Sequence, residues 1–154
     1  MPIDVPETLA TLQETGFRLL AAALLGALLG IDREVKDKPL GLRTNMLVAI
    51  GACSFGIIAL DLAQLFRDQE DLGHVDPARV IEGIIGGIGF LGTGAIIQSR
   101  GAVVGATTGA TIWVVGAIGL ACGFGLYLHA TLVAAVAFFV LSVLGFITRR
   151  WSKA

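Results

Sequence analysis

Five long runs of hydrophobic residues, separated by short polar segments, dominate the pattern of this chain. The runs lie at about residues 12–31, 44–62, 80–97, 104–123 and 126–147. Each is close to the roughly 20 residues that an α-helix needs to cross about 30 Å of hydrocarbon. The pattern therefore predicts an all-α integral membrane protein with about five transmembrane helices. We expect these helices to form a single domain over residues 1–154.

The composition supports this class. Hydrophobic residues make up 55% of the chain and charged residues 15%, far below the roughly 25% charged residues of a soluble domain. The formal net charge of −1 gives no reason to expect a nucleic-acid partner. Cys53 and Cys122 both lie in hydrophobic runs, where a thiol usually behaves as a small buried hydrophobe, so no disulfide framework is expected.

The placement of Lys and Arg predicts the orientation in the membrane. The N-terminus and the second and fourth connections carry only Arg67 and Arg79, and Arg18 lies inside a hydrophobic run. The first and third connections and the C-terminal tail carry eight basic residues: Arg33, Lys36, Lys38, Arg43, Arg100, Arg149, Arg150 and Lys153. By the positive-inside rule the N-terminus faces outward and the C-terminus faces the cytoplasm.

The first cytosolic connection, "GIDREVKDKPLGLRTN", is unusual because acidic and basic residues alternate along it. Orientation alone requires only the basic ones, so the acids indicate pairing or binding. Thr44 or Asn45 is predicted to cap the second helix, whose free N–H groups can hold an anion. The segment either fastens the loop to other helices or recognises a partner or ligand. The candidate binding residues here are Asp32, Arg33, Glu34, Arg43, Thr44 and Asn45.

A second group of charges lies near the predicted outer ends of the helices, comprising Arg18, Asp76, Arg79 and Glu82. A carboxylate at mid-bilayer costs roughly 2.5–3.5 kcal/mol, which makes Glu82 a candidate functional residue. Arg18 is predicted to lie at a similar depth and to pair with Glu82. Four alternatives stay open: pairing of Arg18 with Asp76, pairing of Glu82 with Arg79, snorkelling of Glu82 to the interface, and pairing of Arg18 with Glu14 four residues earlier.

Glycine spacing predicts close helix packing. On the fourth run, five glycines fall within roughly 80° of one another, which lets another backbone approach. The third run has glycines on two faces, so we expect it to sit centrally. These faces predict at least a homodimer, which Gly109→Leu should disrupt. The main packing positions are Gly83, Gly87, Gly105, Gly109 and Gly116.

Two functional classes fit these features better than an enzyme does. His74 and His129 are isolated, Ser54 and Ser99 have no evident base, and no Cys/His spacing suggests zinc, so neither catalysis nor a cofactor is expected. One class is a non-catalytic regulator, surrounded by membrane lipids, that binds another membrane protein or complex. The other is an oligomeric transporter or channel for a cation of the Mg²⁺ type. Its acidic residues would be Asp61, Asp76 and Glu82 outside and Asp32 and Glu34 inside.

Four segments carry a resemblance to a known family: "GIDRE", "KPLGLRTNMLVAIGA", "DPARVIEGIIGGIGFLGTGAII" and "GATTGATIWVVGAIGLACGFGLY". Over nearly its whole length the chain resembles the membrane domain of the MgtC/SapB family. The resemblance implies a bacterial inner-membrane protein linked to adaptation to low magnesium and, in some members, to intracellular survival. It favours the regulator, since such a protein need not carry magnesium itself.

Two features depart from the family pattern. Many members continue into a soluble C-terminal domain, whereas this sequence ends at "RRWSKA" shortly after the last hydrophobic run. We therefore expect a membrane domain alone. Members also often have Gln at the position of Gly83, and here the nearest polar group is Glu82.

Overall fold

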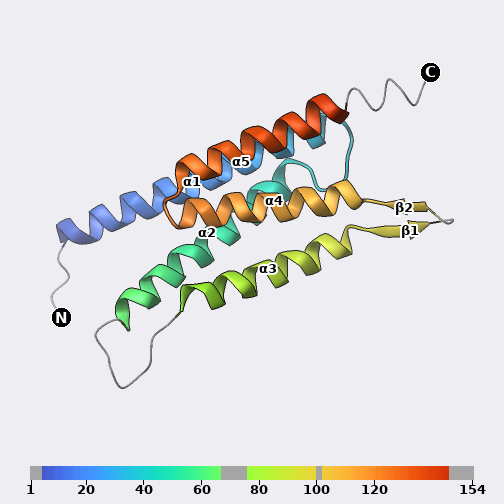
Figure 1. The fold of residues 1–154 in the computed structure, drawn as a ribbon. Helices are drawn as coiled ribbons and strands as arrows, with labels where there is room; N and C mark the ends of the chain where they lie inside the picture. Colours follow the sequence, from blue (N-terminus) through green and yellow to red (C-terminus); the bar gives the residue numbers. More distant parts are fainter. Residues whose placement is uncertain (1–4, 67–75, 100–101, 146–154) are drawn as a thin grey trace.

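The computed structural model describes residues 5–66, 76–99 and 102–145, and within them the chain folds into a bundle of five α-helices (Figure 1). A short antiparallel hairpin of two strands separates the third helix from the fourth. The all-α fold class is thereby confirmed. The elements are α1 (Val5–Val35), α2 (Leu42–Leu65), α3 (Pro77–Gly94), β1 (Ile97–Ser99), β2 (Ala102–Val104), α4 (Ala106–Gly123) and α5 (Tyr127–Phe139), which continues as a π-helix (Val140–Leu144).

Four segments of the described chain are long and apolar enough to cross a membrane. They are Thr11–Val35, Leu42–Leu65, Ala106–Gly123 and Tyr127–Leu144. The fifth helix of the sequence prediction, α3, is not among these four. Its first turns carry Arg79 and Glu82, and glycines make up much of the rest. That α3 crosses the membrane stays a prediction.

The helix ends differ from the sequence prediction in ways that local interactions explain. α1 runs to Val35 rather than Ile31, because Asp32 and Lys36 pair one turn apart at 2.5 Å and continue the helix. α3 ends at Gly94. Beyond it, Ile97 pairs with Val104 in the hairpin, so neither residue is helical.

Two glycines have backbone conformations that other residues rarely adopt. Gly105, just before α4, has φ +93°, and a Cβ there would stand 2.0 Å from the carbonyl oxygen of Ala95. Gly125 has φ +74° in the turn between α4 and α5. That turn is closed by backbone bonds from Gly125 N to Cys122 O (3.0 Å) and from Leu126 N to Ala121 O (2.8 Å). The last two helices therefore form a helical hairpin.

α4 is the central helix of the bundle, and it packs against α1, α2, α3 and α5. α3 lies at the edge, beside α4 and α2 (Figure 1). The sequence-based expectation that the third helix is central was wrong. The reason is that glycines of α4 lie against both α2 and α3. Among the glycines of α3, only at Gly92 would an added Cβ lie within 4 Å of another element.

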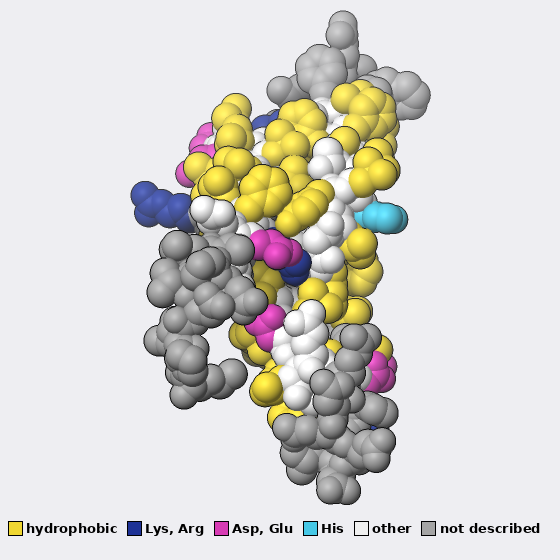
Figure 2. Space-filling model, turned by 90° about the vertical axis from the view of Figure 1, so that its left-hand side faces the viewer, with side chains coloured by type: hydrophobic (Ala, Val, Ile, Leu, Met, Phe, Trp, Pro, Cys, Tyr) yellow, Lys and Arg dark blue, Asp and Glu magenta, His cyan; other side chains and the backbone are white. Residues whose placement is uncertain are grey.

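The interior is built from small side chains, and most large hydrophobic ones face outward. Ala22, Ala49, Cys53 and Ala130 are fully buried, whereas Phe90 is 80% exposed. Figure 2, which views the bundle from the left of Figure 1, shows many hydrophobic side chains on that side, with charged ones among them. This distribution suits a protein surrounded by lipid, where small residues allow close helix contacts. The two cysteines are buried and unbonded to each other.

Candidate functional site

The end of α1, the α1–α2 loop, the start of α4 and the end of α5 meet at the right-hand end of the bundle in Figure 1. The described basic residues of the first connection gather there: Arg33, Lys36, Lys38 and Arg43. These residues lie beside the end of α5, as expected if successive helices cross the membrane in opposite directions. The orientation in the membrane stays a prediction. Five of the basic residues on which that prediction rests lie outside the described ranges: Arg67, Arg100, Arg149, Arg150 and Lys153.

Arg33 fastens the α1–α2 loop to α4. Its side chain is only 4% exposed. Nε and Nη2 donate to the carbonyl oxygen of Pro39 at 3.2 and 3.1 Å. Nη2 also donates to Thr108 Oγ1, and Nη1 donates to Thr111 Oγ1 at 3.3 Å. All four bonds go to neutral acceptors, and within the described residues no carboxylate is hydrogen-bonded to the guanidinium, although Asp32 acts on its charge.

Asp32 and Lys36 tie the end of α1 to the π-helix that follows α5. One carboxylate oxygen of Asp32, Oδ1, accepts from Lys36 Nζ at 2.5 Å and from Ser142 Oγ at 2.6 Å. Lys36 Nζ also donates to the carbonyl oxygen of Leu141 at 3.2 Å. The ion pair therefore links two helices that are more than 100 residues apart in sequence.

The start of α2 is capped by Glu34, which corrects the predicted cap. The residue before α2 is Gly41, and neither Thr44 nor Asn45 caps the helix. Instead Glu34 Oε2 accepts the backbone N–H of Leu42 at 2.9 Å. A Cβ on Gly41 would stand 1.8 Å from that oxygen. The negative group expected at this helix end is therefore the chain's own Glu34 carboxylate, which the α1–α2 turn brings to the first residue of α2.

Asn45 points back into the loop and holds it in a strained shape. Its Nδ2 donates to the carbonyl oxygens of Leu40 (2.7 Å) and Gly41 (2.8 Å). Leu40 has φ +58°, which is uncommon for a bulky residue. Asn45 is 1% exposed, and its Oδ1 has no partner within the described part of the chain. A Cβ on Gly30 of α1 would stand 3.3 Å from the Asn45 Cβ. The other two loop candidates lie further out, with Thr44 half-buried and Arg43 exposed.

A polar cleft of about 650 Å³ opens among these segments. Three cationic side chains and one carboxylate line it, together with the first residues of α4 and the end of α5. The cleft is therefore net positive. Its lining residues include Asp32, Arg33, Lys36, Lys38, Pro39, Gly105, Ala106, Thr107, Thr108, Leu141 and Ser142.

At the opposite end of the bundle, Arg18 does not pair with Glu82. Its Nη2 pairs with Glu14, and its Nη1 donates to the carbonyl oxygen of Gly123 at 2.6 Å, at the end of α4. α1 packs on α2, α4 and α5, whereas α3 packs on α2 and α4, so the two side chains lie on different sides of the bundle. Glu82 is exposed. The structure thus favours the Glu14 alternative.

Asp76 has a structural role in α3. Its Oδ1 accepts the backbone N–H of Ala78 at 2.9 Å, and Pro77 follows it at the first helical position, so Asp76 caps the helix. Arg79 is exposed. In the part of the chain that the structure describes, no group of three or more His, Cys, Asp and Glu side chains is placed to hold a metal ion. His74 lies outside that part.

Neighbouring helices of the same chain pack directly against the glycines of α4. A Cβ on Gly119 would stand 2.2 Å from the carbonyl oxygen of Ala49, and one on Gly109 would stand 2.8 Å from that of Gly92. A Cβ on Gly116 would meet the Ile88 side chain at 2.1 Å. α4 is therefore in close contact with α2 on one side and α3 on the other.

The glycines of α3 are open by contrast. A Cβ on Gly83, Gly86 or Gly87 would have no heavy atom within 4 Å in the described structure. An apolar groove of about 790 Å³ runs beside them between α3 and α2. Residues lining it are Thr44, Leu47, Val48, Gly51, Ala52, Phe55, Val80, Gly83, Ile84, Gly87, Ile88 and Leu91.

Sequence reasoning missed the hydroxyl groups that complete the polar end. Thr108 and Thr111, three residues apart, accept from Arg33, and Ser142 donates to Asp32. A helix that places Thr at positions i and i+3 presents both on one face. That spacing within a glycine-rich apolar run was the available signal.

Comparison with known proteins gives consistent matches. The MgtC family matches residues 19–150. "Protein SapB" of Bacillus subtilis is 38% identical over 82% of this chain and 53% of its own length. "Protein MgtC" of Brucella abortus is 40% identical over 77% and 46%, and the "Putative magnesium transporter YhiD" of Escherichia coli K12 is 38% identical over 71% and 51%. The chain thus spans about half the length of the curated relatives it matches. No solved structure matches it.

Proposed function

This chain belongs to the MgtC family, and we propose that it is a non-catalytic protein of the bacterial inner membrane that acts by binding another membrane protein. The contact surface is the open glycine face of α3 together with the groove between α3 and α2. The proposal extends the family's link to low magnesium, which the names of two matched relatives reflect, one being called MgtC and the other a magnesium transporter.

The observation that supports the proposal most strongly is the contrast between the glycines of α4 and those of α3. In lipid, glycines bring helix backbones together, and those of α4 do so within the chain. Gly83, Gly86 and Gly87 also form a small-residue face, but a Cβ on any of them would have no heavy atom within 4 Å in the described structure. Each glycine costs a helix up to about 1 kcal/mol relative to Ala. A partner helix seated on this face would give these glycines the role that those of α4 already have.

The large side chains around this face also suit a protein contact. Phe90 and Leu91 on α3 are 80% and 51% exposed, and Phe55 across the groove is 56% exposed. Aromatic and aliphatic side chains beside a small-residue groove give a partner helix both a close backbone approach and anchoring contacts.

Cation transport is the second candidate, and the name of the Escherichia coli relative favours it. The geometry supports it less. Of its five proposed acidic residues, Asp32 and Glu34 are bonded to Lys36 and Leu42, and Asp76 caps α3. Asp61 and Glu82 are exposed. A transporter would have to break these contacts or gather ligands from several copies.

The test places a photo-crosslinking residue at position 83 or at the control position 89. Both glycines lie on α3 with nothing within 4 Å of a Cβ, but only Gly83 lines the groove. We expect position 83 to give one discrete adduct with a second protein in cells, and position 89 to give much less of it.

The captured protein is then purified and tested for binding. We expect Gly87→Leu to weaken its binding at least tenfold and Gly89→Leu to leave it within twofold. Growth at low magnesium should be lost with Gly87→Leu at unchanged protein level. Equal binding by the two variants, or adducts only with a second copy of this chain, would overturn the proposed partner.

A further inference from the structure

We propose that the polar cleft and the apolar groove between α4 and α5 form one binding site for a single anionic phospholipid. The phosphate of the head group lies in the cleft, and an acyl chain lies along the groove. This site is separate from the α3 surface of the proposed function and does not depend on it.

The net positive charge of the cleft favours a negatively charged ligand. Arg33, Lys36 and Lys38 line it against a single carboxylate, Asp32, which is already bonded to Lys36 and Ser142. Arg33 is nearly fully buried and bonded only to neutral oxygens. Asp32 is the acidic side chain that acts on the charge of Arg33, and it is also the ion-pair partner of Lys36, so one carboxylate serves both cations. A phosphate in the cleft would supply further negative charge.

The start of α4 makes a smaller contribution to the preference of the cleft for a negative ligand. α2 is capped by the Glu34 carboxylate, but α4 begins at Gly105 with no side-chain cap. The first residues of α4 line the cleft, so the partial positive charge of the helix end has the same sign as the lysines.

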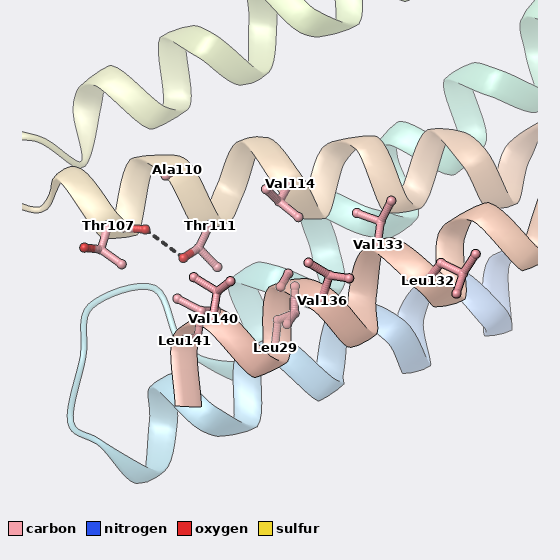
Figure 3. A pocket seen from close by; sticks show the side chains of 11 residues that line it. Leu29, Thr107, Ala110, Thr111, Val114, Leu132, Val133, Val136, Val140 and Leu141 are labelled. Carbon is pink, nitrogen blue, oxygen red and sulfur yellow. Dashed lines mark hydrogen bonds between the residues drawn. The ribbon is translucent and has the colours of Figure 1, made fainter. Parts of the chain in front are cut away.

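The apolar half of the site is the groove shown in Figure 3. It encloses about 500 Å³ between α4 and α5 and is lined almost entirely by hydrocarbon. Val114 of α4 and Val133, Val136 and Val140 of α5 line it, and Val136 is 62% exposed. Its hydroxyl-bearing residues are Thr107 and Thr111, and Thr111 already donates to the carbonyl oxygen of Thr107 at 2.7 Å.

The cleft and the groove are adjacent, because Thr107 and Leu141 line both. The cleft lies where the helices end, and the groove runs from it along the apolar length of α4 and α5 (Figure 3). A ligand that fills both must carry a negative group at one end and hydrocarbon at the other. Membrane phospholipids with anionic head groups have this chemistry and lie at this level of the bilayer.

The experiment measures lipid binding to the purified protein in neutral detergent by native mass spectrometry. Phosphatidylglycerol and phosphatidylcholine are titrated in parallel, and stabilisation against heat by inorganic phosphate is measured separately. We expect one phosphatidylglycerol per chain, held at least tenfold more tightly than phosphatidylcholine. Inorganic phosphate at millimolar concentration should stabilise the protein less than phosphatidylglycerol does.

Matched variants separate this site from general charge attraction. Lys38→Gln removes an exposed cation of the cleft and should weaken phosphatidylglycerol binding about fivefold, the effect of one lysine near an anionic head group. Arg43→Gln removes an exposed cation that does not line the cleft, and binding should stay within twofold. Val136→Trp fills the groove and should weaken binding of both lipids.

Three results would overturn the proposal. Equal retention of the two lipids by the wild type would show that the cleft does not select charge. Equal losses from Lys38→Gln and Arg43→Gln would show general attraction to the surface. Stabilisation by inorganic phosphate as strong as that by phosphatidylglycerol, with Val136→Trp lacking an effect, would show a free-anion site instead of a lipid site.

Discussion

Replacing Gly119 by Ala gives the clearest test of how α4 packs against α2. In an isolated helix this change stabilises by up to about 1 kcal/mol, because Ala is the better helix former. In the bundle the new Cβ would stand 2.2 Å from the carbonyl oxygen of Ala49 and 2.8 Å from its Cα. These are backbone atoms, so no side-chain rotation relieves the clash. α2 and α4 must separate by about 1 Å to restore ordinary contact.

The magnitude follows from comparison with a matched glycine. Gly89 of α3 has nothing within 4 Å of a Cβ, so Gly89→Ala keeps the propensity gain without a clash. The gain is common to both variants. The difference between them therefore equals the steric cost, about 1–3 kcal/mol for overpacking a well-packed contact. At roughly 2–4 °C per kcal/mol for a chain of this size, Gly119→Ala should melt about 2–12 °C below Gly89→Ala.

Thermal unfolding in a mild detergent measures this difference. Gly116→Ala serves as an intermediate case, because its Cβ would meet the end of the flexible Ile88 side chain at 2.1 Å, which can move aside. The expected order of melting temperature is Gly89→Ala, then Gly116→Ala, then Gly119→Ala. If Gly119→Ala is as stable as Gly89→Ala, α2 and α4 do not pack as described.

Four further outcomes are expected. Glu34→Ala should lower the free energy of unfolding by about 1 kcal/mol, because it removes the acceptor at the start of α2; an unchanged melting temperature would refute that cap. In double-mutant cycles, Arg18→Met and Glu14→Met should show a coupling of about 0.2–1 kcal/mol, since the pair is partly exposed. Arg18→Met and Glu82→Met should simply add, and coupling between these two would contradict the structure. Gly109→Leu should reduce the yield of folded protein, because Gly109 lies against the backbone of Gly92; normal folding with loss of a dimer would instead support the homodimer contact that the sequence predicts at Gly109.

The helices could be predicted from sequence because hydrophobic run length and glycine punctuation are local signals. The glycine stripe on α4 followed from the same kind of signal. The cap of α2 could not be predicted, because Glu34 precedes Gly41 by seven residues and reaches it only through the turn. The two threonine acceptors of Arg33 lie 75 and 78 residues further along the chain, a separation that no spacing rule covers.

The position of α3 escaped prediction for a different reason. Glycines on two faces of one helix are compatible with two neighbours inside the chain or with one inside and one outside. Gly92 lies against α4, whereas a Cβ on Gly83 would have no heavy atom within 4 Å in the described structure. The sequence shows that both faces of α3 carry small residues, but it does not show which face packs against another helix of the chain. The predicted homodimer therefore keeps one of its two supporting faces, that of α3, and stays a prediction.

The central claim is that the protein acts by contact and does not carry magnesium. The most direct measurement is magnesium flux into liposomes that contain the purified wild-type protein, with Glu82→Gln as a second sample and empty liposomes as the control. We expect uptake by both samples to equal that of empty liposomes. Magnesium uptake above that background by the wild type, abolished by Glu82→Gln, would contradict it and establish transport.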